Sequence, residues 1–222
     1  MDAAVPPPTP GAAGYPAVFE LDRADRIAWW RPLVHWLLII PHAIVLGALG
    51  IVAELVSIVA WFAILFTAKL PQGLGNLIGL YIRYSNRVNA YYMFMREEYP
   101  PFSFSDTPPD PGDYPAVRTS FEPVYEGRNR LTTFFRVILA IPHFICLAVL
   151  GIVALFATII GFFAVLFTGK WPVVMQDFIL GVLRWNTRGG LAPAASTCDS
   201  ASLGREAQSP YSANYYFLTT AP

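Results

Sequence analysis

Charged residues are scarce in this sequence, and the deficit is concentrated in two windows. Only 14% of the 222 residues are charged, whereas a soluble domain of this size carries about 25%. No lysine or arginine lies within residues 32–68 or 137–169, and the one acid there is Glu54. Because roughly 20 apolar residues cross the hydrocarbon core of a bilayer, the two windows predict an all-α integral membrane protein.

Other signals of chemistry are equally sparse. A net charge of zero and a pI near 6.8 leave no basic surface of the kind that binds nucleic acid, so no such partner is expected. The two cysteines, Cys146 and Cys198, are too few for a disulfide framework or a cysteine-rich metal site. The sequence contains no zinc signature, nucleophile elbow or phosphate-binding loop. We therefore expect no catalytic residues, no metal and no cofactor, and classify the chain as a non-enzyme.

What the sequence does contain is an internal repeat. Residues 41–71 align with residues 142–172 at an offset of 101, and 17 of the 31 positions are identical. The shared positions include the motifs Ile-Pro-His and Phe-Thr-x-Lys-x-Pro. Apolar composition alone does not place proline, histidine and lysine in register, so the alignment indicates a duplicated structural unit.

The repeat and the proline-rich segments divide the chain into five parts. Proline clusters mark a tail at the start and a linker between the repeats, and the last residues have no periodicity. Residues 18–21 and 117–124 are interpreted as possible short β-strands that pair with each other. The predicted parts are a disordered N-terminal tail (1–16), a first membrane repeat (17–98), a linker (99–115), a second membrane repeat (116–188) and a disordered C-terminal tail (189–222).

Each apolar window is too long for one ordinary crossing. A straight helix over the 37 residues from 32 to 68 would measure about 55 Å, nearly twice the hydrocarbon thickness. The alternatives are one crossing helix with the remainder at the interface, or a hairpin that turns near residues 47–50. Basic residues precede, separate and follow the windows, which predicts that all three segments are cytoplasmic and requires an even number of crossings. This favours a transmembrane hairpin in each repeat, with both termini cytoplasmic.

A second kind of segment follows each window. In the first repeat Arg83 and Arg87 fall on one helical stripe, and apolar and tyrosine residues occupy much of the rest. Residues 177–188 begin in the same way. This pattern is typical of an amphipathic helix that lies in the headgroup region. The cationic side chains predicted to contact lipid headgroups are Lys69, Arg83, Arg87, Lys170, Arg184 and Arg188.

Three polar side chains within the windows are candidates for a functional or structural role. His42 and His143 each follow a proline at equivalent positions of the two repeats. A proline frees a backbone carbonyl in a helix, so a structural role beside the resulting kink is favoured over a proton or ligand site. Glu54 has no acidic counterpart, because Leu155 occupies the equivalent position. A hairpin places Glu54 toward water, whereas a single crossing places it in the middle of the bilayer.

The repeated motifs also carry a resemblance to a known family. Together with Arg-Val-x-Ala-Tyr at residues 87–91 and Glu-Tyr-Pro-Pro-Phe-Ser at residues 98–103, they resemble DUF4389, an actinobacterial membrane domain of unknown function. The resemblance covers residues 28–102 and 130–188. It implies a tandem integral membrane protein of the plasma membrane, and it implies no reaction. After Arg188 the sequence departs from the family pattern.

Two functions of different kinds fit these features. The favoured hypothesis is a non-enzymatic membrane scaffold or accessory subunit that organises lipid or partner membrane proteins, self-association included. The alternative is a small transporter or channel, in which the repeats form a pseudo-symmetric pair around a path. The scarcity of polar groups deep in the windows argues against this alternative. The expected partners are the lipid bilayer and other membrane proteins.

Overall fold

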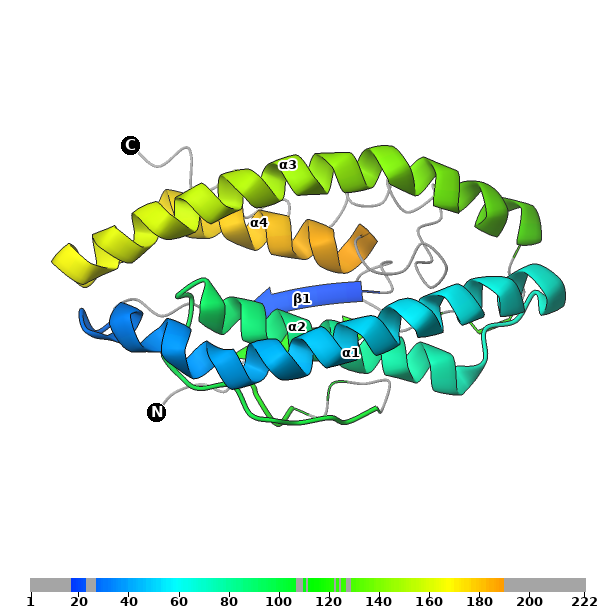
Figure 1. The fold of residues 1–222 in the computed structure, drawn as a ribbon, viewed down its shortest axis with the longest axis horizontal. Helices are drawn as coiled ribbons and strands as arrows, with labels where there is room; N and C mark the ends of the chain where they lie inside the picture. Colours follow the sequence, from blue (N-terminus) through cyan, green and yellow to red (C-terminus); the bar gives the residue numbers. More distant parts are fainter. Residues whose placement is uncertain are drawn as a thin grey trace, which may run out of the picture.

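The order strand, long helix, shorter helix occurs twice along the chain. The structure is a computed structural model that describes residues 17–22, 27–106, 110, 112–121, 123, 125, 126 and 129–189. Its elements are β1 (Ala17–Leu21), α1 (Arg31–Thr67), α2 (Gln72–Tyr92), β2 (Val117–Phe121), α3 (Arg130–Thr168) and α4 (Val173–Gly189) (Figure 1). Apart from Gly189, the two predicted tails lie outside the described residues.

Each long helix is continuous, so the hairpins predicted within the windows are wrong. α1 has 37 residues and α3 has 39, and Gly47 and Gly50 lie inside α1. An interior glycine costs a helix only about 1 kcal/mol, whereas a turn would leave several backbone groups without partners in apolar surroundings. The segments Leu37–Thr67 and Phe144–Thr168 are each long and apolar enough to span a membrane.

The two long helices end in the same way. Ala68 and Gly169, which follow α1 and α3, adopt left-handed backbone conformations with φ of 57° and 64°. The N–H of each donates a 2.8 Å bond to the carbonyl four residues earlier. Pro71 and Pro172 then precede α2 and α4, because proline cannot continue the first helix but is tolerated at the start of the next. The Phe-Thr-x-Lys-x-Pro motif is therefore a helix end in both units.

The two units run in opposite directions. β1 and β2 pair antiparallel, with Phe19 opposite Thr119 at the centre of the register, which confirms the predicted strand pairing. α1 and α3 contact each other and point in opposite directions (Figure 1). Near the end of α1, the Trp61 indole donates a 3.3 Å bond to the carbonyl of Thr133, near the start of α3. An approximate two-fold axis therefore passes through the middle of the ribbon, perpendicular to the long helices.

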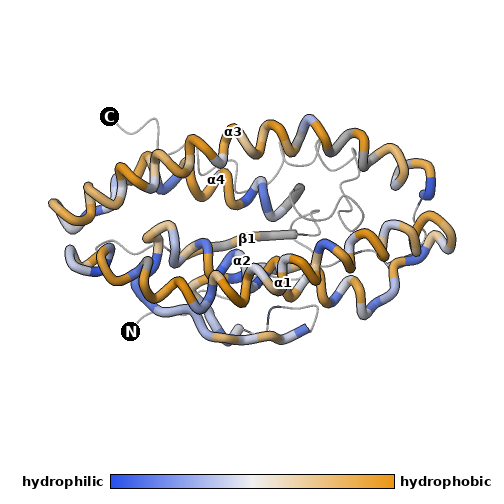
Figure 2. The backbone as a smooth tube through the Cα atoms, in the orientation of Figure 1, coloured by the Kyte–Doolittle hydropathy of each residue, from blue (hydrophilic) through white to orange (hydrophobic). Residues whose placement is uncertain are grey.

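The elements are stacked in layers. α2 contacts both α1 and β2, and α4 contacts both α3 and β1, so the two shorter helices lie between the long helices and the ribbon. In one core cluster, Ile64 of α1, Ile78 of α2 and Phe121 of β2 pack together. The outer sides of α1 and α3 are apolar and exposed along most of their length (Figure 2). The molecule thus has an uncovered apolar face on one side and the ribbon on the other.

Candidate functional site

A chain of polar contacts crosses the centre of the molecule, where α2 meets α4. Asn86 and Thr187 occupy equivalent positions of the two units, 101 residues apart, and the Thr187 hydroxyl donates a 3.2 Å hydrogen bond to Asn86 Oδ1. The Asn86 amide in turn donates to the Thr119 hydroxyl at 3.1 Å. All three side chains are buried, so these bonds join α4, α2 and the ribbon close to the two-fold axis.

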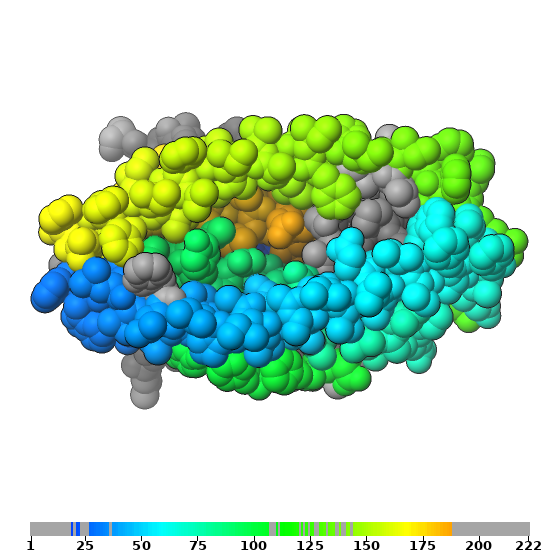
Figure 3. Space-filling model, viewed as in Figure 1, coloured from blue at the N-terminus to red at the C-terminus, as the bar shows by residue number. Residues whose placement is uncertain are grey.

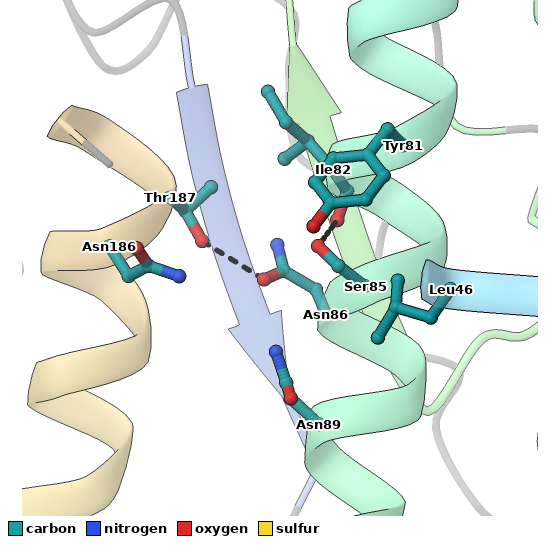
Figure 4. A pocket seen from close by; sticks show the side chains of 8 residues that line it. All are labelled: Leu46, Tyr81, Ile82, Ser85, Asn86, Asn89, Asn186 and Thr187. Atoms are coloured by element: carbon teal, nitrogen blue, oxygen red, sulfur yellow. Dashed lines mark hydrogen bonds between the residues drawn. The ribbon is translucent and has the colours of Figure 1, made fainter. Parts of the chain in front are cut away.

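A pocket of about 220 Å³ lies beside these contacts. Its lining residues are Leu46, Tyr81, Ile82, Ser85, Asn86, Asn89, Asn186 and Thr187 (Figure 4). The space-filling view shows that the face formed by α1 and α3 is hollowed at its centre, with atoms of α2 and α4 at the bottom of the hollow (Figure 3). The described polar lining consists of amides and hydroxyls and carries no charge.

Glu54 lies near the middle of α1 and close to this pocket. Gly50, one helical turn before Glu54, lies against the ring of Tyr81, and residues four apart share one side of a helix. Burial raises the pKa of the Tyr81 hydroxyl, and the Glu54 carboxylate raises it further. The hydroxyl is therefore protonated at neutral pH and provides a hydrogen-bond donor to the pocket. Glu54 itself is exposed. Because α1 is one continuous helix, Glu54 lies near the middle of that helix and not next to a turn.

His42 joins α1 to α2 and does not line the pocket. The buried imidazole has its Nδ1 2.7 Å from the Tyr84 hydroxyl, and its ring stacks on Phe102 with 4.1 Å between centroids. Burial raises the pKa of Tyr84 to about 12, so that hydroxyl keeps its proton and is able to donate to the imidazole. This packing agrees with a structural role. His143 lies in α3 directly after Pro142, and its side chain is outside the described part of the structure.

Two of the predicted headgroup contacts instead point into the protein. Arg87 is buried and pairs with Asp110 at 3.2 Å and with Asp113 at 2.6 Å. Arg83 is also buried and donates to the Ser105 carbonyl at 2.6 Å. Burial alone would raise the pKa of Asp113, but hydrogen bonds, chiefly from Arg87, outweigh it and hold that pKa below its usual range. The headgroup prediction is corrected for both arginines, because the segment after α2 supplies their partners.

The other predicted cations lie in different settings. Lys69 and Lys170 are exposed just beyond the ends of α1 and α3, where headgroup contact remains open to them. Lys69 also pairs with a glutamate 3.0 Å away. Arg184 is partly buried and donates to the Phe19 carbonyl at 3.4 Å. The side chain of Arg188 lies outside the described residues.

Sequence reasoning missed the pocket and its asparagines. Asn86, Asn89 and Asn186 look from the sequence like the polar sides of surface helices, and only the packing of α2 against α4 brings them together. A signal was available, since positions 86 and 187 are equivalent in the repeat and polar in both copies. Among the described residues, no three histidine, cysteine or acidic side chains gather closely enough to hold a metal ion.

These features define a mostly helical chain of two similar units, with two apolar helices long enough to span a membrane and a polar pocket between the units. A family model described as a domain of unknown function (DUF4389) matches residues 29–103 and 130–192. The chain therefore belongs to the DUF4389 family. The two matched segments contain α1 with α2 and α3 with α4. No curated protein and no solved structure matches the chain.

Proposed function

We propose that the protein is a non-enzymatic membrane scaffold that lies in one leaflet of the bilayer, with α1 and α3 parallel to the membrane plane. The observation that carries the proposal is the difference between its two sides. α1 and α3 form one broad apolar face, roughly 55 Å long (Figure 2). Their contacts with α2 and α4, which in turn contact β2 and β1, put the ribbon on the opposite side. A single leaflet has about 15 Å of hydrocarbon, which is enough to hold a helix about 10 Å across.

The charges at the centre of the molecule disfavour a crossing along its long axis. In that orientation the two-fold axis, and with it the ribbon, would sit at the middle of the bilayer. The ion pairs of Arg87 with Asp110 and Asp113 lie beside Asn86, near that axis. Charged groups and the open edges of a two-stranded sheet are costly at that depth. With α1 and α3 in the membrane plane, the same groups face water or a partner protein.

The distribution of basic residues fits this orientation. Basic residues before, between and after the apolar windows require an even number of crossings, and zero crossings satisfy the requirement as well as two per window. We therefore place the protein in the cytoplasmic leaflet of the plasma membrane, with both termini cytoplasmic. Lys69 and Lys170, exposed at the ends of the long helices, are positioned to reach headgroups. This arrangement replaces the multi-pass topology expected from the sequence.

A scaffold of this shape acts on lipid through the volume that it occupies. Two adjacent helices inserted in one leaflet spread the lipids of that leaflet and leave the other unchanged. The layer of α2, α4 and the ribbon then faces the cytoplasm, where it is available to partner membrane proteins or to further copies of the chain.

A small transporter is the second candidate, and one observation favours it. The polar pocket is lined by residues of both units and lies close to the two-fold axis, and transporters built from inverted repeats bind their substrates at the interface between the repeats. That function requires the long helices to cross the membrane, so the orientation of the helices decides between the two candidates.

The decisive experiment labels the two ends of the molecule. Cys146 and Cys198 are replaced with serine, and single cysteines are placed at Gln72 or Val173, which are exposed equivalent positions at opposite ends. A membrane-impermeant thiol reagent is then applied to intact and to permeabilised cells. The scaffold predicts that both positions react only after permeabilisation. Reaction of one position in intact cells would place the two ends on opposite sides and favour the transporter.

A further inference from the structure

We propose that the central pocket binds the headgroup of an uncharged, hydroxyl-bearing lipid of the acylglycerol class. The inference rests on the proposed function in one respect, since the ligand enters from the leaflet in which α1 and α3 lie. The pocket, its chemistry, its size and its position each support it.

The lining offers hydrogen bonds that the protein leaves unused. Within the described part of the chain, the side-chain amides of Asn89 and Asn186 and the Tyr81 hydroxyl make no side-chain hydrogen bond to another protein group. The amides of Asn86, Asn89 and Asn186 extend into the space between α2 and α4 (Figure 4). Asn86 is already bonded to Thr187 and Thr119, but the amides of Asn89 and Asn186 each present two donors and one acceptor. This set matches hydroxyl groups, which both donate and accept.

The charge distribution selects against phosphate. None of the described lining residues is cationic, and the two buried arginines of α2 are committed elsewhere. Arg87 pairs with Asp110 and Asp113, and Arg83 donates to the Ser105 carbonyl. Glu54, close enough to act on Tyr81, places a negative charge beside the pocket. An anionic headgroup would therefore lose its hydration without gaining a counter-charge from the described lining. A neutral polyol needs hydrogen bonds and no counter-charge.

The size and position of the pocket suit a small headgroup with attached chains. A volume of about 220 Å³ is below the range of sites that enclose a whole drug-sized ligand. Glycerol-sized groups fit this space, and complete lipids do not. Leu46 of α1 borders the pocket, the face formed by α1 and α3 is hollowed at its centre (Figure 3), and the exposed side chains of both helices are mostly apolar. Acyl chains are therefore expected to lie along the long helices while the hydroxyl end enters the pocket.

The test measures binding by the full-length protein in detergent micelles, so that it does not depend on membrane orientation. The probes are dioctanoylglycerol, dioctanoyl phosphatidic acid, which has the same chains with a phosphate on the free hydroxyl, and glycerol alone. We expect saturable binding of dioctanoylglycerol that is at least about tenfold tighter than that of either comparator. Equal or tighter binding of the phosphatidic acid would overturn the proposal. Glycerol binding as tightly as the lipid would also overturn it, since the pocket would then belong to a soluble polyol.

Variants separate the pocket from unspecific apolar binding. The double substitution Asn89→Leu with Asn186→Leu removes two amides that bond no protein side chain, and we expect it to weaken dioctanoylglycerol binding about tenfold or more. Gln72→Leu, an exposed position at the start of α2, is the matched control and should have no effect. If the double variant does not fold, Leu46→Trp fills the pocket from α1 and serves in its place. Unchanged binding by a folded pocket variant would overturn the proposal, and it would leave the orientation of α1 and α3 untouched.

Discussion

At the scale of single residues, buried polar contacts between different elements fix the order of the layers. His42 with Tyr84 joins α1 to α2, and Thr187 with Asn86 joins α4 to α2. These partners are distant in the sequence, and each is buried. Removing one partner leaves the other without its hydrogen bond, so the cost of a single substitution is larger than the net value of the bond itself.

His42→Phe is expected to lower the free energy of unfolding by about 1–3 kcal/mol, because the Tyr84 hydroxyl loses its buried hydrogen-bond partner. Tyr84→Phe should cost a similar amount. The double variant should cost less than the sum of the two, since both polar groups are then absent and the stacking on Phe102 is kept. Denaturant unfolding of the purified protein in detergent measures all three. Strictly additive costs would show that the two side chains are not coupled.

His35, which precedes the apolar segment Leu37–Thr67, predicts a dependence of stability on pH. Burial, and to a smaller extent the charge of Arg31, lower its pKa to about 4, with Glu97 acting in the opposite direction. Below the ordinary pKa of about 6.5, the unfolded chain binds a proton that the folded protein does not. Stability is therefore lost as the pH falls from about 6.5 towards 4, by roughly 3 kcal/mol in all.

The measurement compares unfolding of the native protein and of His35→Phe at pH 7 and at pH 4.5. Phenylalanine keeps the stacking of this position against Tyr91 and Phe94 but does not titrate. The native protein should lose roughly 2–3 kcal/mol more than the variant on acidification. Equal losses would show that His35 takes up a proton in the folded state as readily as in the unfolded one.

At the scale of the elements, each long helix packs against a residue of the short segment that follows its C-terminal end. In the first unit Ala60 of α1 and Leu70 are both buried in one core cluster. In the second unit Gly161 and Trp171 occupy the equivalent positions, and a Cβ added at Gly161 would overlap the ring of Trp171. The two pairs fill equivalent space in the two units. In the first unit the helix residue is larger and its partner is smaller, and in the second unit the sizes are reversed.

Gly161→Ala is expected to destabilise the protein by about 1–3 kcal/mol through overpacking against Trp171. Adding Trp171→Leu to that variant recreates the pair found in the first unit and should recover at least about 1 kcal/mol. Gly151→Ala, where a Cβ meets nothing within 4 Å, is the control and should be neutral or slightly stabilising. Thermal unfolding in detergent ranks the stability of the three variants. A Gly161→Ala variant as stable as the control would contradict the proposed packing.

The sequence predicts closely where the helices lie along the chain. It does not predict whether a long helix continues or turns, or which groups its neighbours contact. The windows 32–68 and 137–169 predict α1 and α3 because an uncharged run of that length has few other structures available. The glycines of residues 47–50 allow either a turn or a continuous helix, and the choice depends on surroundings outside the window. Arg83 and Arg87 are similarly ambiguous, since the same stripe suits lipid phosphates or the carbonyl and carboxylate acceptors of the segment after α2.

At the scale of the whole molecule, the proposed membrane orientation rests on the antiparallel arrangement of the two units. The two-fold axis passes through the ribbon and is perpendicular to the long helices. α1 and α3 therefore lie on one side of the molecule, and the ribbon lies on the other side. The pocket is lined from both units and is not visible in either repeat alone, which is why sequence reasoning missed it while predicting the helices. The apolar face and the central pocket both arise from the pairing of the units.

The depth of α1 in the bilayer tests the proposed orientation most directly. Nitroxide labels are placed singly at Leu37, Ile44, Ile51 and Ile58, which are exposed and follow one side of the helix at seven-residue spacing. Each step advances about 10 Å along the helix. Accessibility to oxygen and to a water-soluble nickel chelate then gives the depth of each label in reconstituted vesicles. A helix in the membrane plane predicts four similar depths within one leaflet, whereas depths that pass from one interface through the bilayer centre toward the other would contradict it.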